Sequence, residues 1–251
     1  MDKLIYTAFN TLNNIYDNRS VRAQNMSNIS VPGYRRDIGT KASGTAFMVG
    51  ENTLNSRALA IRDDKNYFEG SPGTLSQTDI KTDIAIRGEG YLVVQGLGEP
   101  SLSRRGDLKV DQNGVLMNGA SVKVLNVNLQ PINVPAHRNI KINETGDVLV
   151  EPLGSAPGTE VNLGRIAMTL AEGADLKKFP DGEIRVSDGT IPALDEGVRV
   201  IPKFIELSNV NITEELVNTI EDQRQYEINV KLISSTSEID SAGASLLRMP
   251  N

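Results

Sequence analysis

The chain has 251 residues, of which 39% are hydrophobic and 23% charged, and these fractions are typical of a folded protein of one or two domains. The net charge is −6, which argues against a nucleic-acid partner because such a surface needs a basic stripe. The absence of cysteine excludes disulfides, thiolate catalysis and cysteine-ligated zinc. His137 is the only histidine, so a multi-histidine metal site is excluded and any Ser-His-Asp triad would have to use it.

No segment of the sequence has the length and apolar character of a membrane span, so the protein is not expected to cross a membrane. The N-terminus also lacks the pattern of a cleavable secretory signal, because it turns polar at Asn10, Asn13 and Asn14. We therefore expect a cytosolic protein, or one that is exported by a route that reads no such signal.

The N-terminal residues 1–31 contain neither glycine nor proline and predict a helix. Pro32-Gly33 ends it, because the residue before a proline avoids the helical region. Arg19 and Arg22 lie on the same stripe as the apolar residues, which gives that stripe a polar middle. The stripe consists of Ile5, Ala8, Leu12, Ile15, Arg19, Arg22, Met26 and Ile29.

The middle of the chain is predicted to be an antiparallel β region, since residues 32–202 contain all but one of the 22 glycines. Residues 37–66 have weak periodicity and are expected to form an extended excursion. Residues 83–94 indicate two short strands about the Gly88-Glu89-Gly90 turn, which lacks the context of a phosphate-binding loop. Hairpins are predicted over residues 108–117 and 140–150, where glycine-containing turns separate apolar runs.

A second helix is predicted from about residue 212, with Asn211 as its N-cap and Thr213 as the alternative cap. Glu214 and Glu215 would lie in its first turn, where the helix dipole favours carboxylates. Its apolar stripe is thin, with a first group on one face and later members seven residues apart. The stripe consists of Leu216, Val217, Ile220, Ile228, Leu232, Ile239 and Leu246. The fold class is therefore α+β, with paired terminal helices and a central antiparallel β domain.

The sequence indicates no catalytic site and no cofactor. His137 lies in a polar stretch without an adjoining nucleophile or acid, so a surface loop is favoured over a catalytic role. The adjacent carboxylates Asp63-Asp64 and Glu214-Glu215 diverge on a strand or helix and form no acid–base dyad. A secreted β-domain enzyme or an adhesin remains the competing hypothesis.

Several motifs together resemble the flagellar axial proteins, the family of rod and hook subunits. Residues 23–36, with Asn25, Asn28 and Pro32-Gly33-Tyr34, are similar to the signature that closes the family's N-terminal helix. Residues 73–94 and 103–119 resemble its central β motifs. Residues 204–249 resemble its C-terminal helix, and their family positions are Ser208, Asn209, Arg224, Tyr226 and Glu227. The first eight residues favour the proximal rod members, with the distal rod members as the alternative.

This resemblance implies a structural subunit of the bacterial flagellar basal body, not an enzyme. The family implies export through the flagellar type III apparatus without a cleaved signal, and assembly in the periplasm into a hollow drive shaft. The expected partners are copies of the chain, a more proximal rod subunit and the distal rod protein. Residues 1–36 and 204–251 would form the paired helices, residues 37–82 a linker and the start of the β region, and residues 83–203 the β domain. The expected assembly interface is Ile5, Leu12, Ile15, Arg19, Arg22, Met26, Ile29, Leu216, Ile220, Ile228, Leu232, Ile239 and Leu246.

Overall fold

The computed structural model describes residues 2–39, 42–49, 56–62, 67–96, 98–179 and 181–247. The chain divides into two compact units, each of which is assembled from separated segments. The helical unit contains residues 1–27, 37–66 and 211–251, and the β unit contains residues 28–36 and 67–210. The α+β class predicted from the sequence is confirmed.

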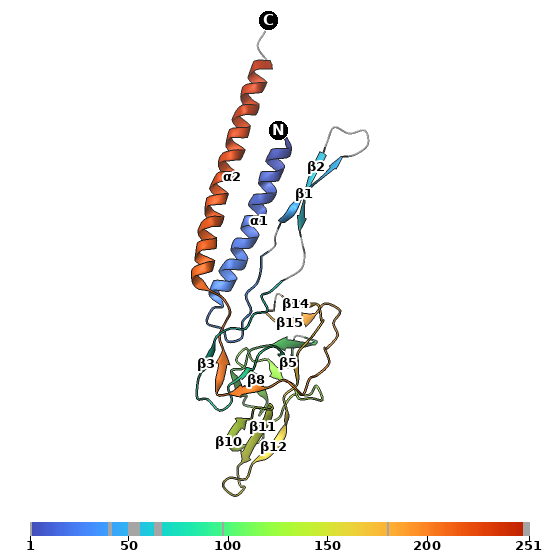
Figure 1. The fold of residues 1–251 in the computed structure, drawn as a ribbon, viewed down its shortest axis with the longest axis vertical. Coiled ribbons are helices and arrows are strands. Elements are labelled where there is room, and N and C mark those ends of the chain that lie inside the picture. Colours follow the sequence, from blue (N-terminus) through green and yellow to red (C-terminus); the bar gives the residue numbers. More distant parts are fainter. Residues whose placement is uncertain are drawn as a thin grey trace. The chain divides into compact units, whose positions relative to one another are not determined.

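The helical unit contains two helices and one hairpin (Figure 1). Helix α1 spans Asp2–Ser27 and lies against α2, which spans Ile212–Leu247. Strands β1 (Ala42–Val49) and β2 (Ser56–Arg62) pair antiparallel and contact α1. This hairpin lies within residues 37–66, where the sequence predicted an extended excursion. The sequence of β2 favours a strand, because larger apolar residues alternate along it with alanine or arginine.

Helix α2 begins where the sequence predicts, whereas α1 ends before the predicted stop at Pro32-Gly33, so Ile29 lies beyond the helix. Asn211 caps α2, because its Oδ1 accepts hydrogen bonds from the backbone N–H of Thr213 at 3.0 Å and of Glu214 at 3.4 Å. The Asn211 cap is thus confirmed over the Thr213 alternative. Helix α1 ends at Ser27, a few residues before Pro32, and a turn follows it.

The β unit is built around an eight-stranded sheet with the strand order β14-β15-β6-β5-β9-β8-β7, in which β13 also pairs with β5. A three-stranded sheet, β10-β11-β12, and two pairs, β16-β4 and β17-β3, complete it. The strands are β3 (Leu75–Gln77), β4 (Ile84–Ile86), β5 (Tyr91–Gln95), β6 (Pro100–Ser103), β7 (Leu108–Val110), β8 (Leu116–Asn118), β9 (Lys123–Val124), β10 (His137–Ile142), β11 (Asp147–Pro152), β12 (Val161–Arg165), β13 (Met168–Thr169), β14 (Leu176–Lys178), β15 (Ile184–Val186), β16 (Val200–Pro202) and β17 (Phe204–Glu206).

The predicted hairpins are confirmed at β7-β8 and β10-β11. Strands β4 and β5 also exist on either side of the glycine turn, but they belong to different sheets. Both are fully buried along most of their length, and β5 supplies Leu92 and Val94 to the main core. The turn therefore moves the chain between two sheets instead of closing a hairpin.

The two boundaries of the β unit differ from those expected from composition. Residues 28–36 belong to the β unit although they follow directly on α1. Strand β17 pairs with β3, so the β unit continues to Val210 and the helical unit resumes at Asn211. The predicted boundaries were placed where glycine and proline become rare in the sequence. The observed boundaries differ because they depend on strand pairing and buried polar contacts.

Candidate functional site

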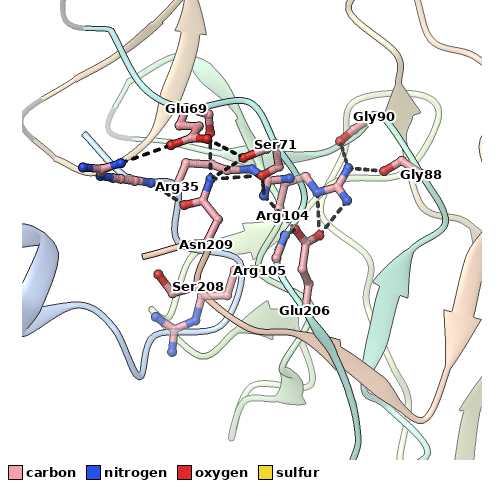
Figure 2. A network of polar contacts seen from close by, with 12 residues as sticks. Arg35, Glu69, Ser71, Gly88, Gly90, Arg104, Arg105, Glu206, Ser208 and Asn209 are labelled. Carbon is pink, nitrogen blue, oxygen red and sulfur yellow. Dashed lines mark hydrogen bonds and ion pairs between the residues drawn. The ribbon is translucent and has the colours of Figure 1, made fainter. Parts of the chain in front are cut away.

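The most buried polar cluster of the β unit consists of Arg35, Arg104 and Glu206, which we call the buried triad (Figure 2). Arg35 Nη1 lies 2.7 Å from Glu206 Oε1. Arg104 grips the other oxygen, with Nε at 2.7 Å and Nη2 at 2.6 Å from Oε2. Because both partners are ionised, these are charge-assisted hydrogen bonds, which are stronger than neutral ones. The triad joins the segment after α1, the end of β6 and the end of β17.

Backbone groups complete the triad. Gly73 N–H donates to Glu206 Oε1 at 2.8 Å, and Arg104 Nη1 donates to the carbonyls of Gly88 and Gly90 at 2.8 Å each. The turn predicted at Gly88-Glu89-Gly90 thus serves as a pair of acceptors for a buried guanidinium. A buried charge destabilises the fold unless it is paired and hydrogen-bonded. These contacts therefore offset the cost of burying the charges of the triad.

Gly33 brings the N-terminal segment close to the triad. Its φ is +67°, and an added Cβ would lie 2.4 Å from the carbonyl carbon and oxygen of Arg104. Its N–H donates to the Glu206 carbonyl at 2.7 Å. The Pro32-Gly33 motif therefore does more than stop a helix, since glycine at this position permits a backbone-to-backbone approach that any side chain would block.

The triad is an electrostatic anchor. Burial lowers the pKa of Arg35, and the neighbouring Arg104 acts in the same direction, while Glu206 opposes both. Burial also raises the pKa of Tyr91, which lies near these charges. Arg35, Arg104 and Glu206 are each less than 5% exposed, so they hold the fold together instead of presenting a reactive surface.

Beside the triad, Asn209 connects further segments (Figure 2). Its Oδ1 accepts a hydrogen bond from Arg36 N–H at 2.7 Å, and its Nδ2 donates to the carbonyls of Glu69 and Ser71 at 3.0 Å each. Its own N–H donates to the Tyr34 carbonyl at 3.3 Å. Asn209 thus ties together three stretches of chain that are distant in sequence.

Lys178 closes the same region from β14. Its Nζ donates to the Arg35 carbonyl at 2.7 Å and lies 3.7 Å from the centre of the Tyr34 ring. Such cation–π contacts are strongest when the cation is removed from water, and Lys178 is only 5% exposed. The family motif residue Tyr34 is thereby part of the β unit.

In the helical unit, the contact between α1 and α2 is polar. Arg22 Nε lies 2.6 Å from Asp222 Oδ2, and Arg22 Nη1 lies 3.5 Å from Glu215 Oε2. Asn25 Nδ2 donates to Glu215 Oε1 at 3.1 Å. Glu215, Asp222 and Thr236 are the buried members of α2, and they recur at intervals of seven or fourteen residues. We call these residues, with Arg22 and Asn25, the polar seam.

Most of the apolar residues of α2 are left uncovered within the described chain. Leu216 is 51% exposed, Ile220 65%, Ile239 58% and Leu246 68%. We call the exposed residues of the predicted stripe the outer apolar face, and they are Leu216, Val217, Ile220, Ile228, Leu232, Ile239 and Leu246; Ile212, Tyr226 and Val230 of α2 are exposed as well. These residues of the predicted stripe therefore do not cover α1 of the same chain.

The remaining predicted interface residues lie in varied environments. Ile15 is buried, whereas Leu12, Met26 and Ile29 are half-buried. Arg19 is exposed, with Nη1 3.5 Å from Gln223 Oε1. Ile5 lies in α1, but its side chain is outside the described residues. The assembly role of all these residues stays a prediction.

The family motif residues separate into two groups. Asn25, Pro32, Gly33, Tyr34 and Asn209 take part in or adjoin the contacts described above. Asn28 accepts a hydrogen bond from Val31 N–H in the turn after α1, and Ser208 accepts one from Val210 N–H. By contrast, Arg224, Tyr226 and Glu227 are exposed on α2. Among them, Glu227 Oε1 accepts a hydrogen bond from Gln223 Nε2 at 3.2 Å, one turn earlier on the same helix.

The sequence analysis did not single out Arg104, Glu206, Glu215 or Asp222 as connected residues. Arg104 and Glu206 are 102 positions apart, and no local pattern reports such a pairing. The polar seam could have been predicted from the sequence, because polar residues recur every seven positions at Glu215, Asp222, Asn229 and Thr236. A search for apolar periodicity overlooks a stripe made of polar side chains.

An open hollow of about 730 Å³ lies in the β unit, between the loops of residues 169–175 and 186–196. Its polar lining includes the carboxylates Glu172, Asp175, Asp188 and Asp195, with no histidine, lysine or arginine among the lining residues. His137 is on another side of the unit, where its Nδ1 is 2.9 Å from the Pro135 carbonyl.

The Asp147 carboxylate, in the three-stranded sheet, accepts hydrogen bonds from the side chains of Asn143, Thr145 and Arg165. Burial acts to raise its pKa, but hydrogen bonds from Thr145, Arg165 and Asn143 outweigh burial and hold the pKa below its ordinary value of 3.8. These contacts stabilise the turn between β10 and β11, and they indicate a structural role for the carboxylate.

Comparison with known proteins agrees with the motifs. A family profile described as the FlgE/F/G D1 domain of flagellar hook protein matches residues 85–150, and one described as the C-terminal part of flagellar basal body rod FlgEFG protein matches residues 201–246. The flagellar basal-body rod protein FlgF of Salmonella typhimurium is 28% identical over 99% of this chain and 100% of its own length. FlgF of Escherichia coli is equally similar. These matches support a flagellar rod protein.

Rod proteins of a second kind are also similar to this one. FlgG of Buchnera aphidicola subsp. Schizaphis graminum is 28% identical over 88% of this chain and 91% of its own length. The chain is thus similar to both FlgF and FlgG, and the two FlgF relatives named above match over a larger share of it than this FlgG does. In the described parts of this rod protein, neither helix holds a stretch long and apolar enough to cross a bilayer.

Proposed function

We propose that this rod protein is a proximal rod subunit that polymerises through its terminal helices. The observation that carries the proposal is the outer apolar face of α2, which its own chain leaves uncovered. Burial of apolar surface is the main driving force of association, at roughly 25 cal/mol per Å². A neighbouring subunit that covers this face would gain that energy.

The polar seam explains why the face stays available. Arginine and carboxylate side chains hold α2 against α1, and the heptad spacing of the seam selects one register. The apolar residues then point away from the intrachain contact and toward other copies. In this arrangement each chain brings a pre-formed helix pair to the assembly.

In the assembled rod, the paired helices would line a hollow shaft that transmits torque and lets export substrates pass. The β unit would lie outside it. The proposed partners are copies of the chain, a more proximal rod subunit and the distal rod protein FlgG, and the type III export apparatus would deliver the chain to the periplasm. No catalytic step is needed for this role.

FlgG is the alternative within the family, because relatives of that name match over most of the chain. Purified basal bodies separate the two. We expect the chain at the proximal part of the rod when an epitope tag in the exposed 153–158 loop is located by immuno-electron microscopy. Labelling at the distal part would favour FlgG, and absence from purified basal bodies would contradict a rod function.

The enzyme alternative is tested on the same protein. If the purified chain clears a suspension of cell walls in a turbidity assay, the hypothesis of a β-domain enzyme is favoured over a purely structural subunit. An adhesin would instead be recovered free or on the cell surface.

A further inference from the structure

Two consecutive backbone amides are captured by two different asparagine side chains. Arg36 N–H donates to Asn209 Oδ1 at 2.7 Å, and Asp37 N–H donates to Asn25 Oδ1 at 2.9 Å. Arg36 is the last residue of a β-unit segment, and Asp37 is the first residue of the following helical-unit segment. The peptide link that joins the units at this point is therefore held on both of its sides.

Each asparagine also uses its amide donor to bind other connections of its own unit. In the β unit, Asn209 donates to the Glu69 and Ser71 carbonyls, and these residues lie just after the chain has entered the unit at Tyr67. The Asn209 side chain thus binds the segment that leaves the β unit after Arg36 and the segment that enters it at Tyr67. Asn209 itself lies next to Val210, where the chain leaves the β unit again.

In the helical unit, Asn25 does the same. Its Nδ2 donates to the Asp37 carbonyl at 2.9 Å and to Glu215 Oε1 at 3.1 Å, and Asn25 is only 1% exposed. It lies in the last turn of α1, near the exit at Ser27, while Glu215 lies in the first turn of α2. Asn25 therefore binds the connection that enters at Asp37 and the first turn of α2.

A primary amide is suited to this task, since one side chain supplies both an acceptor and two donors for backbone groups. Aspartate would keep the acceptor but lose the donors and repel the carbonyls. Alanine would lose every bond. These contacts join segments that are not parts of one sheet or helix, so the regular hydrogen bonding of the fold does not replace them.

We propose that Asn25 and Asn209 are positioning residues that gather the connections between the two units at one point on each unit. Torque that passes between helices and β unit must cross these connections, and gathering them shares the load among several chain segments. The torque part rests on the proposed rod function, whereas the gathering itself is a property of the single chain.

Amide hydrogen exchange of the purified full chain tests the positioning role. In Asn209→Ala we expect the Arg36 amide to exchange about tenfold faster, and in Asn25→Ala the Asp37 amide, because each loses its acceptor. The matched control is Asn143→Ala. Asn143 also binds two backbone N–H groups, those of Thr145 and Asp147, but within one hairpin turn. The control should leave Arg36 and Asp37 unchanged.

Unchanged exchange at Arg36 and Asp37, or an equal increase in the Asn143 control, would overturn the positioning role. Asn209→Asp adds a second variant, which keeps the side-chain acceptor of the Arg36 N–H and should therefore leave the Arg36 amide protected, in contrast to Asn209→Ala. A general loss of protection across the β strands in that variant would also contradict the proposal, because it would show a role in overall stability.

Swimming tests the torque part in a strain that lacks the protein. Both alanine variants should assemble into basal bodies, and their swimming speed should fall below that of the Asn143 control as the viscosity of the medium rises. Equal speeds at all viscosities, with faster exchange in the purified variants, would overturn the torque part. If the chain is absent from basal bodies while exchange changes as expected, the proposed function fails and the positioning role stands.

Discussion

Removing the Glu206 carboxylate should destabilise the β unit more than any exposed ion pair does. The carboxylate receives contacts from Arg35, Arg104 and Gly73 N–H at 2.6–2.8 Å, and the residue is 1% exposed. Glu206→Ala leaves two guanidinium groups buried and without their common partner. Breaking a buried ion pair in this way costs about 3–5 kcal/mol.

That loss is a large part of the roughly 5–15 kcal/mol that stabilises a typical domain. For a domain of this size it corresponds to a fall in the melting temperature of about 6–20 °C. Urea and thermal unfolding followed by circular dichroism measure it, since the chain contains no tryptophan for fluorescence. If Glu206→Ala does not fold, Glu206→Gln provides a milder variant in which the charge is removed and the shape is kept.

The matched control is Glu160→Ala. Glu160 pairs with Lys141, but both side chains are more than 40% exposed, so the loss should stay below about 1 kcal/mol. If Glu206→Ala costs no more than the Glu160 control, then the triad is not an anchor and our reasoning about the buried cluster is refuted.

Three further predictions concern single residues. Gly33→Ala should cost at least about 2 kcal/mol more than Gly154→Ala in urea unfolding, because both have positive φ but only Gly33 lies against the Arg104 backbone; equal costs would refute the close approach. Asp147→Asn should flatten the loss of stability as the pH falls below about 4, since a lowered pKa contributes stability above the unfolded value that disappears on protonation; an unchanged pH profile would contradict this. Ile220→Asp should leave monomer stability within about 0.5 kcal/mol, because Ile220 is 65% exposed, yet prevent incorporation into basal bodies; normal basal bodies would remove Ile220 from the interface.

Local chemistry was sufficient to predict much of the fold from the sequence. The Asn211 cap, the turn at Gly114 and the hairpin turn before Asp147 each depend on residues within a few positions of one another. Such signals need no knowledge of the tertiary structure. The helix α2 itself was also predicted correctly, because its cap and the absence of proline from residues 203–249 are local signals.

What could not be predicted depends on contacts between distant residues. The sequence shows that Pro32-Gly33 ends a helix, but not that Gly33 packs on Arg104 and so places residues 28–36 in the β unit. It likewise shows an apolar stripe on α2, but not which face meets α1. The polar seam decides that question, since Glu215 and Asp222 pair with Arg22 about 200 positions away.

The most direct test of the account asks whether the outer apolar face is covered in the rod. The chain contains no cysteine, so Ile239→Cys and the exposed control Glu160→Cys each introduce one reactive thiol. Both should react rapidly with a maleimide in the purified monomer. In purified basal bodies, we predict that the thiol at position 239 is protected while the thiol at position 160 still reacts. Equal labelling of both thiols in basal bodies would contradict assembly through this face of α2.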